Sequence, residues 1–235
     1  MKFNVRFFWG AVALFFIIGG VFYSGLGRFG KAWVSAMVTE PQPMAFNYEV
    51  IPGSSGRRIY LLHGFRDNRD FWRREPYSTF TEVMLEAGHE IVLIDLPYAH
   101  ADFLNDGGTQ YCNRFREFMI SLQAELGPPD ETVIVGASWG GWHAMMIADL
   151  AARYVVFKPV TDPTSLSEFW WKQSSGDACS FREGRGLAIY SPMDPRVGDA
   201  TSVLRAAGTV MQISEREDHG VTTTDLMLAL EFLHD

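Results

Sequence analysis

Cysteine is scarce in this sequence, which limits the kinds of site that the chain can build. Cys112 and Cys179 are the two cysteines among 235 residues, and they form neither a Cys-x-x-Cys pair nor a cysteine–histidine spacing typical of a metal site. We therefore expect no structural zinc, no other metal and no cofactor. The two thiols either pair in an oxidising compartment or stay buried and free, and the sequence leaves both alternatives open.

Positive charge is scarce over most of the chain. Residues 1–39 carry four cations and no acid, whereas residues 40–235 carry 16 cations and 28 acids. Binding to nucleic acid requires a basic surface, so this acidic body argues against a nucleic-acid partner.

The sequence has no internal repeat and no low-complexity tract, and its apolar share of 47% is that of a folded chain. Its length allows one well-cored domain and a short extra segment.

The N-terminal region differs from the rest of the chain. Lys2 and Arg6 precede an uncharged apolar run over residues 7–23, which is at the lower limit for a helix that spans a membrane. The run is apolar on all sides, and small residues suited to a signal peptidase are poorly placed. We expect residues 1–27 to be an uncleaved signal anchor, or else a cleaved signal peptide, and residues 28–45 to be a linker. The protein would then be membrane-anchored or exported, on the periplasmic or extracellular side, although the flanking cations leave the orientation open.

The remainder alternates between segments with the pattern of strands and segments with the pattern of helices. This alternation predicts an α/β domain over residues 46–235, with a mostly parallel central sheet and helices on both faces. The expected strands are 58–62, 90–95, 132–135, 154–157, 187–190 and 210–213, and the expected helices are 71–87, 113–126, 138–152, 199–207 and 221–233.

The sharpest local signal is Gly136-Ala137-Ser138-Trp139-Gly140, which directly follows an apolar strand and precedes a helix. A serine hydroxyl is a weak nucleophile that needs an exposed position and a neighbouring base. A tight strand-to-helix turn provides the exposure, glycines at both ends relieve the crowding, and the positive end of the helix dipole lies beside the serine. The pattern alone occurs by chance in surface turns, but this setting predicts that Ser138 is a nucleophile.

A second signal is His63-Gly64-Phe65, which follows another predicted strand. A developing oxyanion needs two converging N–H donors. The loop after this strand can supply the amide of Phe65, and the turn at Ser138 can supply the amide of Trp139. Taken by itself, the His-Gly dipeptide fits an ordinary turn with a packed histidine.

An acid and a base follow two later strands. Asp194 lies just past the strand at 187–190, at the edge where open α/β sheets bind ligands, and Asp162 is the fallback acid. His219 lies between the last strand and the last helix, and it completes the chain order serine, aspartate, histidine. An aspartate in such a position orients the histidine and stabilises its imidazolium. Histidines at element edges, in a loop or inside a helix are expected to be structural: His89, His100, His143 and His234.

Together these residues resemble the α/β-hydrolase superfamily over most of the chain. The resemblance implies a serine hydrolase with Ser138, Asp194 and His219 as its catalytic triad. It also implies that the amides of Phe65 and Trp139 form the oxyanion hole. A serine as nucleophile argues against the haloalkane dehalogenase and epoxide hydrolase branches, which have an aspartate there. The implied reaction is hydrolysis of a small-molecule carboxylic ester through an acyl-enzyme. Acyl transfer, thioester or peptide hydrolysis, and a non-catalytic binding module are the alternatives.

The sequence departs from the lipase pattern in two places. His63-Gly64-Phe65 has one glycine where many lipases have several. The segment between the strands at 154–157 and 187–190 is short, so any cap domain is small. An aromatic cluster in that segment, Phe169-Trp170-Trp171, either lines an apolar acyl pocket or packs under a loop.

Overall fold

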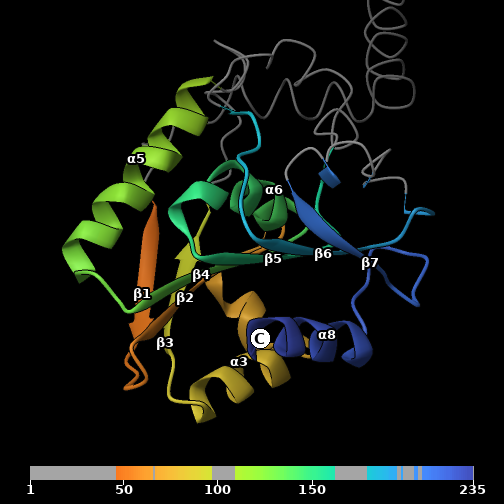
Figure 1. Cartoon of the computed structure of the whole chain (residues 1–235), viewed down its shortest axis with the longest axis horizontal. Helices are drawn as coiled ribbons and strands as arrows, with labels where there is room; N and C mark the ends of the chain where they lie inside the picture. Colours follow the sequence, from red (N-terminus) through yellow and green to blue (C-terminus); the bar gives the residue numbers. More distant parts are fainter. Residues whose placement is uncertain are drawn as a thin grey trace, which may run out of the picture. The chain divides into compact units, whose positions relative to one another are not determined.

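One sheet organises the part of the chain that the computed structural model describes (Figure 1). The described residues are 46–65, 67–96, 109–161, 179–194, 197, 204–205 and 208–234. The predicted anchor or signal segment (1–27), the predicted linker (28–45) and the aromatic cluster (169–171) lie outside them. Within the described ranges, no helix combines the length and the apolar character needed to cross a membrane.

The sheet has seven strands in the order β1-β3-β2-β4-β5-β6-β7. The strands are β1 (Asn47–Ile51), β2 (Arg57–Leu62), β3 (Glu90–Asp95), β4 (Glu131–Ala137), β5 (Arg153–Phe157), β6 (Gly186–Tyr190) and β7 (Thr209–Ile213). Among these strands, β1 alone runs antiparallel to its neighbour, and the other pairs are parallel. The structure therefore confirms the predicted mostly parallel sheet and each expected strand, with small extensions at the ends. Strand β1 was not predicted, because an edge strand with partly exposed side chains has no buried apolar run.

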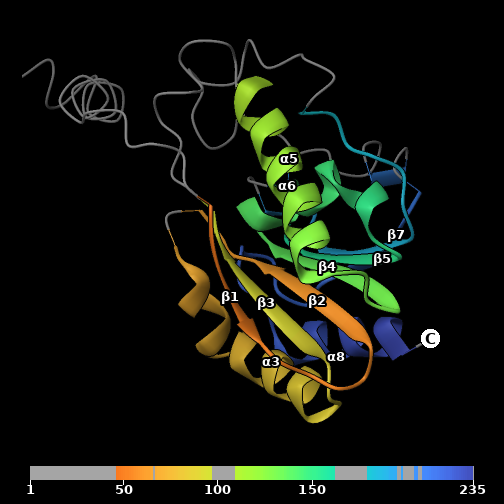
Figure 2. The ribbon, with the colours of Figure 1, turned by 90° about the vertical axis from the view of Figure 1, so that its left-hand side faces the viewer.

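Helices cover both faces of the sheet (Figures 1 and 2). Helices α5 (Thr109–Leu126) and α6 (Trp139–Met146) lie on one face, and α3 (Tyr77–Glu86) and α8 (Thr223–His234) lie on the other. Successive side chains of the central strands alternate between the two cores. In β2, for example, Tyr60 packs into the core under α5 and α6, whereas Leu61 packs into the core under α3 and α8.

Three helices differ clearly from the sequence prediction, whereas the helix expected over 221–233 is present as α8 (Thr223–His234) with small shifts at its ends. The helix expected over 71–87 is interrupted: a short helical turn, η1 (Arg69–Arg73), precedes α3, which begins after Pro76 because proline lacks an N–H and restricts the residue before it. The helix expected over 138–152 ends at Met146, where a tighter bond from Ile147 N–H to Ala144 O leads into η2 (Ala148–Leu150). Helix α5 begins at Thr109 rather than at residue 113. Most of the helix expected over 199–207 lies outside the described residues.

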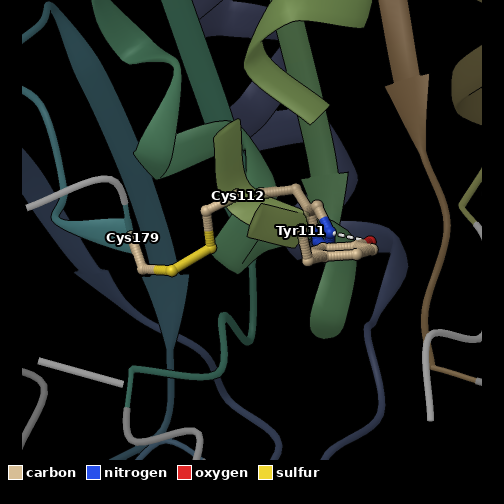
Figure 3. Close-up of a disulfide and its surroundings, with 4 residues drawn as sticks. Tyr111, Cys112 and Cys179 are labelled. Carbon is tan, nitrogen blue, oxygen red and sulfur yellow. Dashed lines mark hydrogen bonds between the residues drawn. A yellow bond between two sulfur atoms is a disulfide. The ribbon is translucent and has the colours of Figure 1, made fainter. Parts of the chain in front are cut away.

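Cys112 and Cys179 form a disulfide, so the first of the two alternatives left open by the sequence is present (Figure 3). Cys112 lies in the first turn of α5, and Cys179 lies in the segment that leads to β6. Their Cα atoms are 5.3 Å apart across a sequence separation of 67 residues. The bond therefore links α5, which covers one face of the sheet, to the segment that leads into β6.

Candidate active site

Ser138 occupies the turn between β4 and α6 with an unusual backbone conformation. Its φ of 53° and ψ of −112° lie in a region that side chains rarely adopt. Neighbouring backbone holds it there: Ser138 N–H donates to Phe157 O at 2.8 Å, and Ser138 O accepts from Val160 N–H at 3.2 Å. The last residue of β5 and the segment that follows it therefore hold the backbone of Ser138 through both its N–H and its carbonyl. Such a turn holds the serine side chain away from the sheet.

The glycines on either side of Ser138 are required by the close approach of backbone. A Cβ atom on Gly136 would lie 2.2 Å from Gly140 O, and one on Gly140 would lie 2.1 Å from Leu62 O. A side chain at either position would thus collide with backbone atoms. The structure confirms the prediction that small residues relieve crowding in the turn of residues 136–140, which we call the elbow.

The structure brings Ser138, Asp194 and His219 into one hydrogen-bonded chain. Nε2 of His219 lies 2.7 Å from Ser138 Oγ, and Nδ1 of His219 is hydrogen-bonded to Asp194 Oδ2. An ionised carboxylate only accepts, so Nδ1 carries the proton and the Nε2 lone pair of the neutral ring faces the serine hydroxyl. Asp194 is 2% exposed, whereas the His219 side chain is 18% exposed. The acid is therefore shielded from water, and the imidazole reaches the surface.

Asp194 lies in a tight turn directly after β6. Its N–H donates to Ser191 O at 3.2 Å, and its carbonyl accepts from Val197 N–H at 3.1 Å. The turn fixes the carboxylate at the carboxyl end of the strand, as the sequence predicted. The fallback acid, Asp162, lies outside the described residues.

The loop of residues 214–222, which we call the histidine loop, is fastened to the start of α8. Thr222 and Asp225 form a capping box: Asp225 N–H donates to Thr222 Oγ1 at 3.1 Å, and Thr222 N–H donates to Asp225 Oδ2 at 2.8 Å. The same carboxylate accepts from the hydroxyl of Ser214 at 2.8 Å. One buried carboxylate thus closes both ends of the loop that carries His219.

A second set of contacts orders the middle of the histidine loop. The Arg216 guanidinium pairs with the Asp218 carboxylate, with Nη2 donating to Oδ2 at 2.8 Å. Gly220 N–H also donates to Asp218, at 2.9 Å. These contacts, the ion pair with Arg216 first among them, lower the pKa of Asp218 to about 2. Asp218 thus links Arg216 to Gly220, and His219 lies between these two residues in the sequence.

Phe65 and Trp139 lie beside the serine, on the two segments expected to form an oxyanion hole. Their rings meet edge to face with centroids 5.7 Å apart. A Cβ atom on Gly64 would lie 3.8 Å from Ser138 Cβ, so the loop after β2 packs against the elbow. Trp139 is the first residue of α6, and the first N–H groups of a helix have no acceptor within the helix.

His63 has a structural role at the end of β2. The N–H of Leu96 donates to His63 Nε2 at 2.8 Å, so Nδ1 carries the ring proton and donates to Gly64 O at 2.7 Å. Burial lowers the pKa of His63, which keeps the ring neutral. Both ring nitrogens are occupied, and the histidine ties the end of β2 to the residue that follows β3.

Another buried histidine, His143, contacts the backbone of the elbow. His143 in α6 donates from Nδ1 to Trp139 O at 2.8 Å, and its Nε2 lies 2.5 Å from the hydroxyl of Tyr111, which must donate. Tyr111 precedes the disulfide-bonded Cys112 (Figure 3). The prediction that His143 is structural agrees with this placement, but no sequence pattern indicated its link to Tyr111.

The remaining histidines lie away from this site or outside the described residues. His89 and His234 line a cavity of about 370 Å³ together with Arg57 and Glu131, which belong to the amino ends of β2 and β4. That edge of the sheet is opposite to the one that holds Ser138. His100 lies outside the described residues. Within the described ranges, no group of three or more histidine, cysteine or acidic side chains is arranged to hold a metal ion.

Lys158 is a site residue that sequence reasoning missed. It directly follows β5, is 1% exposed, and donates from Nζ to the backbone carbonyl of Arg216 at 2.6 Å. No motif contains it, and the signal that could have drawn attention to it is a lysine at the end of an apolar strand.

Solved structures of several hydrolases share this fold. The fluorophosphonate-binding serine hydrolase F of Staphylococcus aureus, solved with substrate bound, is 13% identical and has a TM-score of 0.58, with 83% of this chain and 95% of that chain covered. The Bacillus cereus carboxylesterase is 14% identical, with a TM-score of 0.58 and coverage of 82% and 95%. The monoacylglycerol lipase of Paleococcus ferrophilus is 11% identical, with a TM-score of 0.56 and coverage of 81% and 98%. At such identities the likeness establishes the fold.

Sequence comparison identifies the family. No curated protein matches the sequence. The sequence model described as the alpha/beta hydrolase family matches residues 59–226, which is more than half of the chain and spans the elbow, the loop of Asp194 and the histidine loop. The chain therefore belongs to the alpha/beta hydrolase family.

Proposed function

We propose that this protein is a serine hydrolase that cleaves small-molecule carboxylic esters through an acyl-enzyme on Ser138. The observation that carries the proposal is the hydrogen-bonded chain from Ser138 through His219 to Asp194. A hydroxyl becomes a competent nucleophile when a base lies within hydrogen-bond distance and a third group orients that base. The similarity of the fold to a carboxylesterase and a monoacylglycerol lipase supports an ester as the substrate.

In the proposed acylation step, Ser138 Oγ attacks the ester carbonyl carbon while His219 Nε2 takes the hydroxyl proton. The tetrahedral intermediate then collapses as His219 gives this proton to the leaving alcohol, and the acyl group stays on Ser138. Asp194 stays ionised and stabilises the imidazolium that forms between the two transfers.

Deacylation repeats the chemistry with water as the nucleophile. His219 takes a proton from water, the hydroxide adds to the acyl carbon, and the proton returns to Ser138 Oγ as the carboxylic acid leaves. The amides of Phe65 and Trp139 are the donors that we assign to the oxyanion in both steps. Removal of one such donor in a serine hydrolase costs about 3 kcal/mol of transition-state stabilisation.

A fluorophosphonate probe, together with p-nitrophenyl esters of increasing chain length, tests the nucleophile. The full chain should be labelled and should release p-nitrophenol, and Ser138→Ala should do neither. Ser121→Ala, which removes an exposed hydroxyl from α5, is the matched control and should behave as wild type. A wild-type chain that is neither labelled nor active on any ester would show that the proposed function is wrong.

The same assay tests the acid and the second nucleophile. Asp194→Asn should reduce kcat by roughly 10⁴-fold, because the imidazole would lose the partner that fixes its tautomer, whereas Asp162→Asn should leave kcat unchanged. The reverse result would transfer the role of the acid to Asp162.

An ester product that accumulates when an alcohol is added would indicate acyl transfer in place of hydrolysis.

We also propose that residues 1–27 anchor the chain in a membrane or direct its export. The uncharged run of residues 7–23 supports this, and so does the disulfide, because such bonds persist in oxidising compartments. Fractionation of cells that express the full chain should find it in the membrane or outside the cytoplasm. Recovery of the full-length, reduced chain from the cytoplasm would contradict the proposal.

A further inference from the structure

Lys158 stands out among the buried side chains of the hydrolase domain. The sequence contains 16 arginines and four lysines, and Lys158 is the one lysine within the described ranges. Its side chain is buried, and its backbone φ of 46° lies in the left-handed region, which is uncommon for any residue other than glycine. A buried cation and an unfavourable φ each cost stability, so their combination at one position points to a function.

The backbone of Lys158 is fixed at the carboxyl edge of the sheet. Its N–H donates to Ile189 O at 2.7 Å, one residue before the end of the strand that precedes Asp194. The residue just before it, Phe157, accepts the N–H of Ser138 at 2.8 Å. The backbone of Lys158 is thus hydrogen-bonded to β6, the strand that leads to Asp194. The preceding residue is hydrogen-bonded to Ser138.

The side chain of Lys158 reaches the segment that carries the base. Its Nζ donates to the carbonyl oxygen of Arg216, three residues before His219 in the sequence, at 2.6 Å. The side chain of Arg216 pairs with Asp218, the residue next to His219. A single ammonium group therefore connects the end of β5 to the middle of the histidine loop.

Three acidic side chains interact electrostatically with the ammonium group. Burial lowers the pKa of Lys158, and Arg216 lowers it further, whereas the carboxylates of Asp225 at the start of α8, Asp194 after β6 and Asp218 in the histidine loop raise it. Asp225 and Asp194 are 1% and 2% exposed, so little water compensates their charge. Oδ1 of Asp225 has no hydrogen-bond partner among the described residues, so its charge depends on longer-range interaction with cations such as Lys158.

We propose that Lys158 is a positioning residue of the triad, which holds the histidine loop through the Arg216 carbonyl and balances the buried carboxylates around His219. This inference rests on the proposed function, because it assigns a role relative to His219 as the base. Lys158 does not touch the reacting atoms. It acts on the distance between His219 and Ser138 and on the charge that the imidazole experiences.

Two unbranched replacements separate the hydrogen bond from the charge. Lys158→Met has similar volume and lacks both, whereas Lys158→Gln keeps an N–H donor and lacks the charge, and both keep the backbone conformation comparably strained. Arg116→Met is the control, because it removes a cation that pairs with Asp149 on the surface of η2, away from the site. Urea unfolding of each variant establishes that it is folded under the assay conditions.

The measurement is the pH profile of ester hydrolysis by the full chain. Lys158→Met should lower kcat roughly 10- to 100-fold with little change in KM, because a misplaced base slows chemistry more than binding. Removal of a nearby positive charge makes the imidazole easier to protonate, so the acidic limb of kcat/KM should move to higher pH by roughly 0.5 to 1 unit in both variants. Lys158→Gln should recover part of kcat while its acidic limb stays shifted, and Arg116→Met should match wild type.

Each outcome decides a specific claim. If both folded Lys158 variants show the wild-type kcat, or a lower kcat with an unshifted acidic limb, the positioning role is wrong and Lys158 is merely structural. If Lys158→Met does not fold, Lys158→Gln alone decides by the same criterion. A wild-type chain that is inactive overturns the proposed function and this role with it, whereas an active wild type with unchanged variants overturns the role of Lys158 alone.

Discussion

At the scale of single residues, the contacts of each imidazole decide what that ring can do. His63 and His143 both donate from Nδ1 to a backbone carbonyl and accept a hydrogen bond at Nε2, so both nitrogens are committed to protein groups. His219 also donates from Nδ1, but its Nε2 faces the hydroxyl of Ser138. The first arrangement joins elements of the fold, and the second leaves a lone pair that can accept a proton in a reaction.

His143 should make folding stability depend on pH. Burial lowers its pKa from 6.5 to about 3. Between these values the unfolded chain binds a proton at this position and the folded chain does not, so the free energy of unfolding falls as the pH falls. From pH 6 to pH 4.5, this one group should remove about 2 kcal/mol.

The comparison of wild type with His143→Gln measures this contribution. The glutamine cannot titrate, so the variant should lose about 2 kcal/mol less than wild type between pH 6 and pH 4.5 in urea unfolding. At pH 7 the variant should be the less stable protein, by about 1 to 3 kcal/mol, because the fit to Tyr111 and Trp139 is disturbed. Parallel pH dependences in the two proteins would show that His143 does not titrate in this way.

At the scale of elements, the sequence was informative where burial imposes a simple pattern. Strands such as β3 and β4 are covered on both faces and appear as continuous apolar runs, so their positions were predicted closely. Strand β1 has mostly half-buried residues and gains its place by pairing with β3, which no local pattern encodes. The break before α3 was missed because the apolar spacing continues past Pro76, whereas the helical backbone is interrupted between η1 and α3.

The sequence likewise predicted only part of the candidate site. Ser138, Asp194 and His219 each follow a strand and lie in recognisable loops, so chain order and strand ends were enough to select them. Lys158 carries no motif, and its partner, Arg216, is 58 residues away in the sequence. Such a contact depends on how β5 and the histidine loop meet at the edge of the sheet, which only the three-dimensional structure contains.

At the scale of the whole described domain, the parallel sheet explains how distant residues meet. The carboxyl ends of parallel strands lie at the same edge, so the segments after β2, β4, β5, β6 and β7 converge there. The disulfide adds a covalent link between parts that the sheet order separates. Helix α5 precedes central strand β4 in the chain, whereas Cys179 leads to β6, the neighbour of edge strand β7.

Reduction of the disulfide should therefore destabilise the domain as a unit. A bond across 67 residues of sequence removes about 4 kcal/mol of chain entropy from the unfolded state in the loop-closure model. Urea unfolding with and without a reducing agent should show a loss of that order, and the double variant Cys112→Ser, Cys179→Ser should unfold like the reduced wild type in both conditions. Because the triad is carried by β4, β6 and β7 and not by either cysteine, ester hydrolysis well below the unfolding transition should stay within a few-fold of wild type. A reducing agent that leaves the unfolding curve unchanged, or that acts equally on the double variant, would contradict this role for the bond.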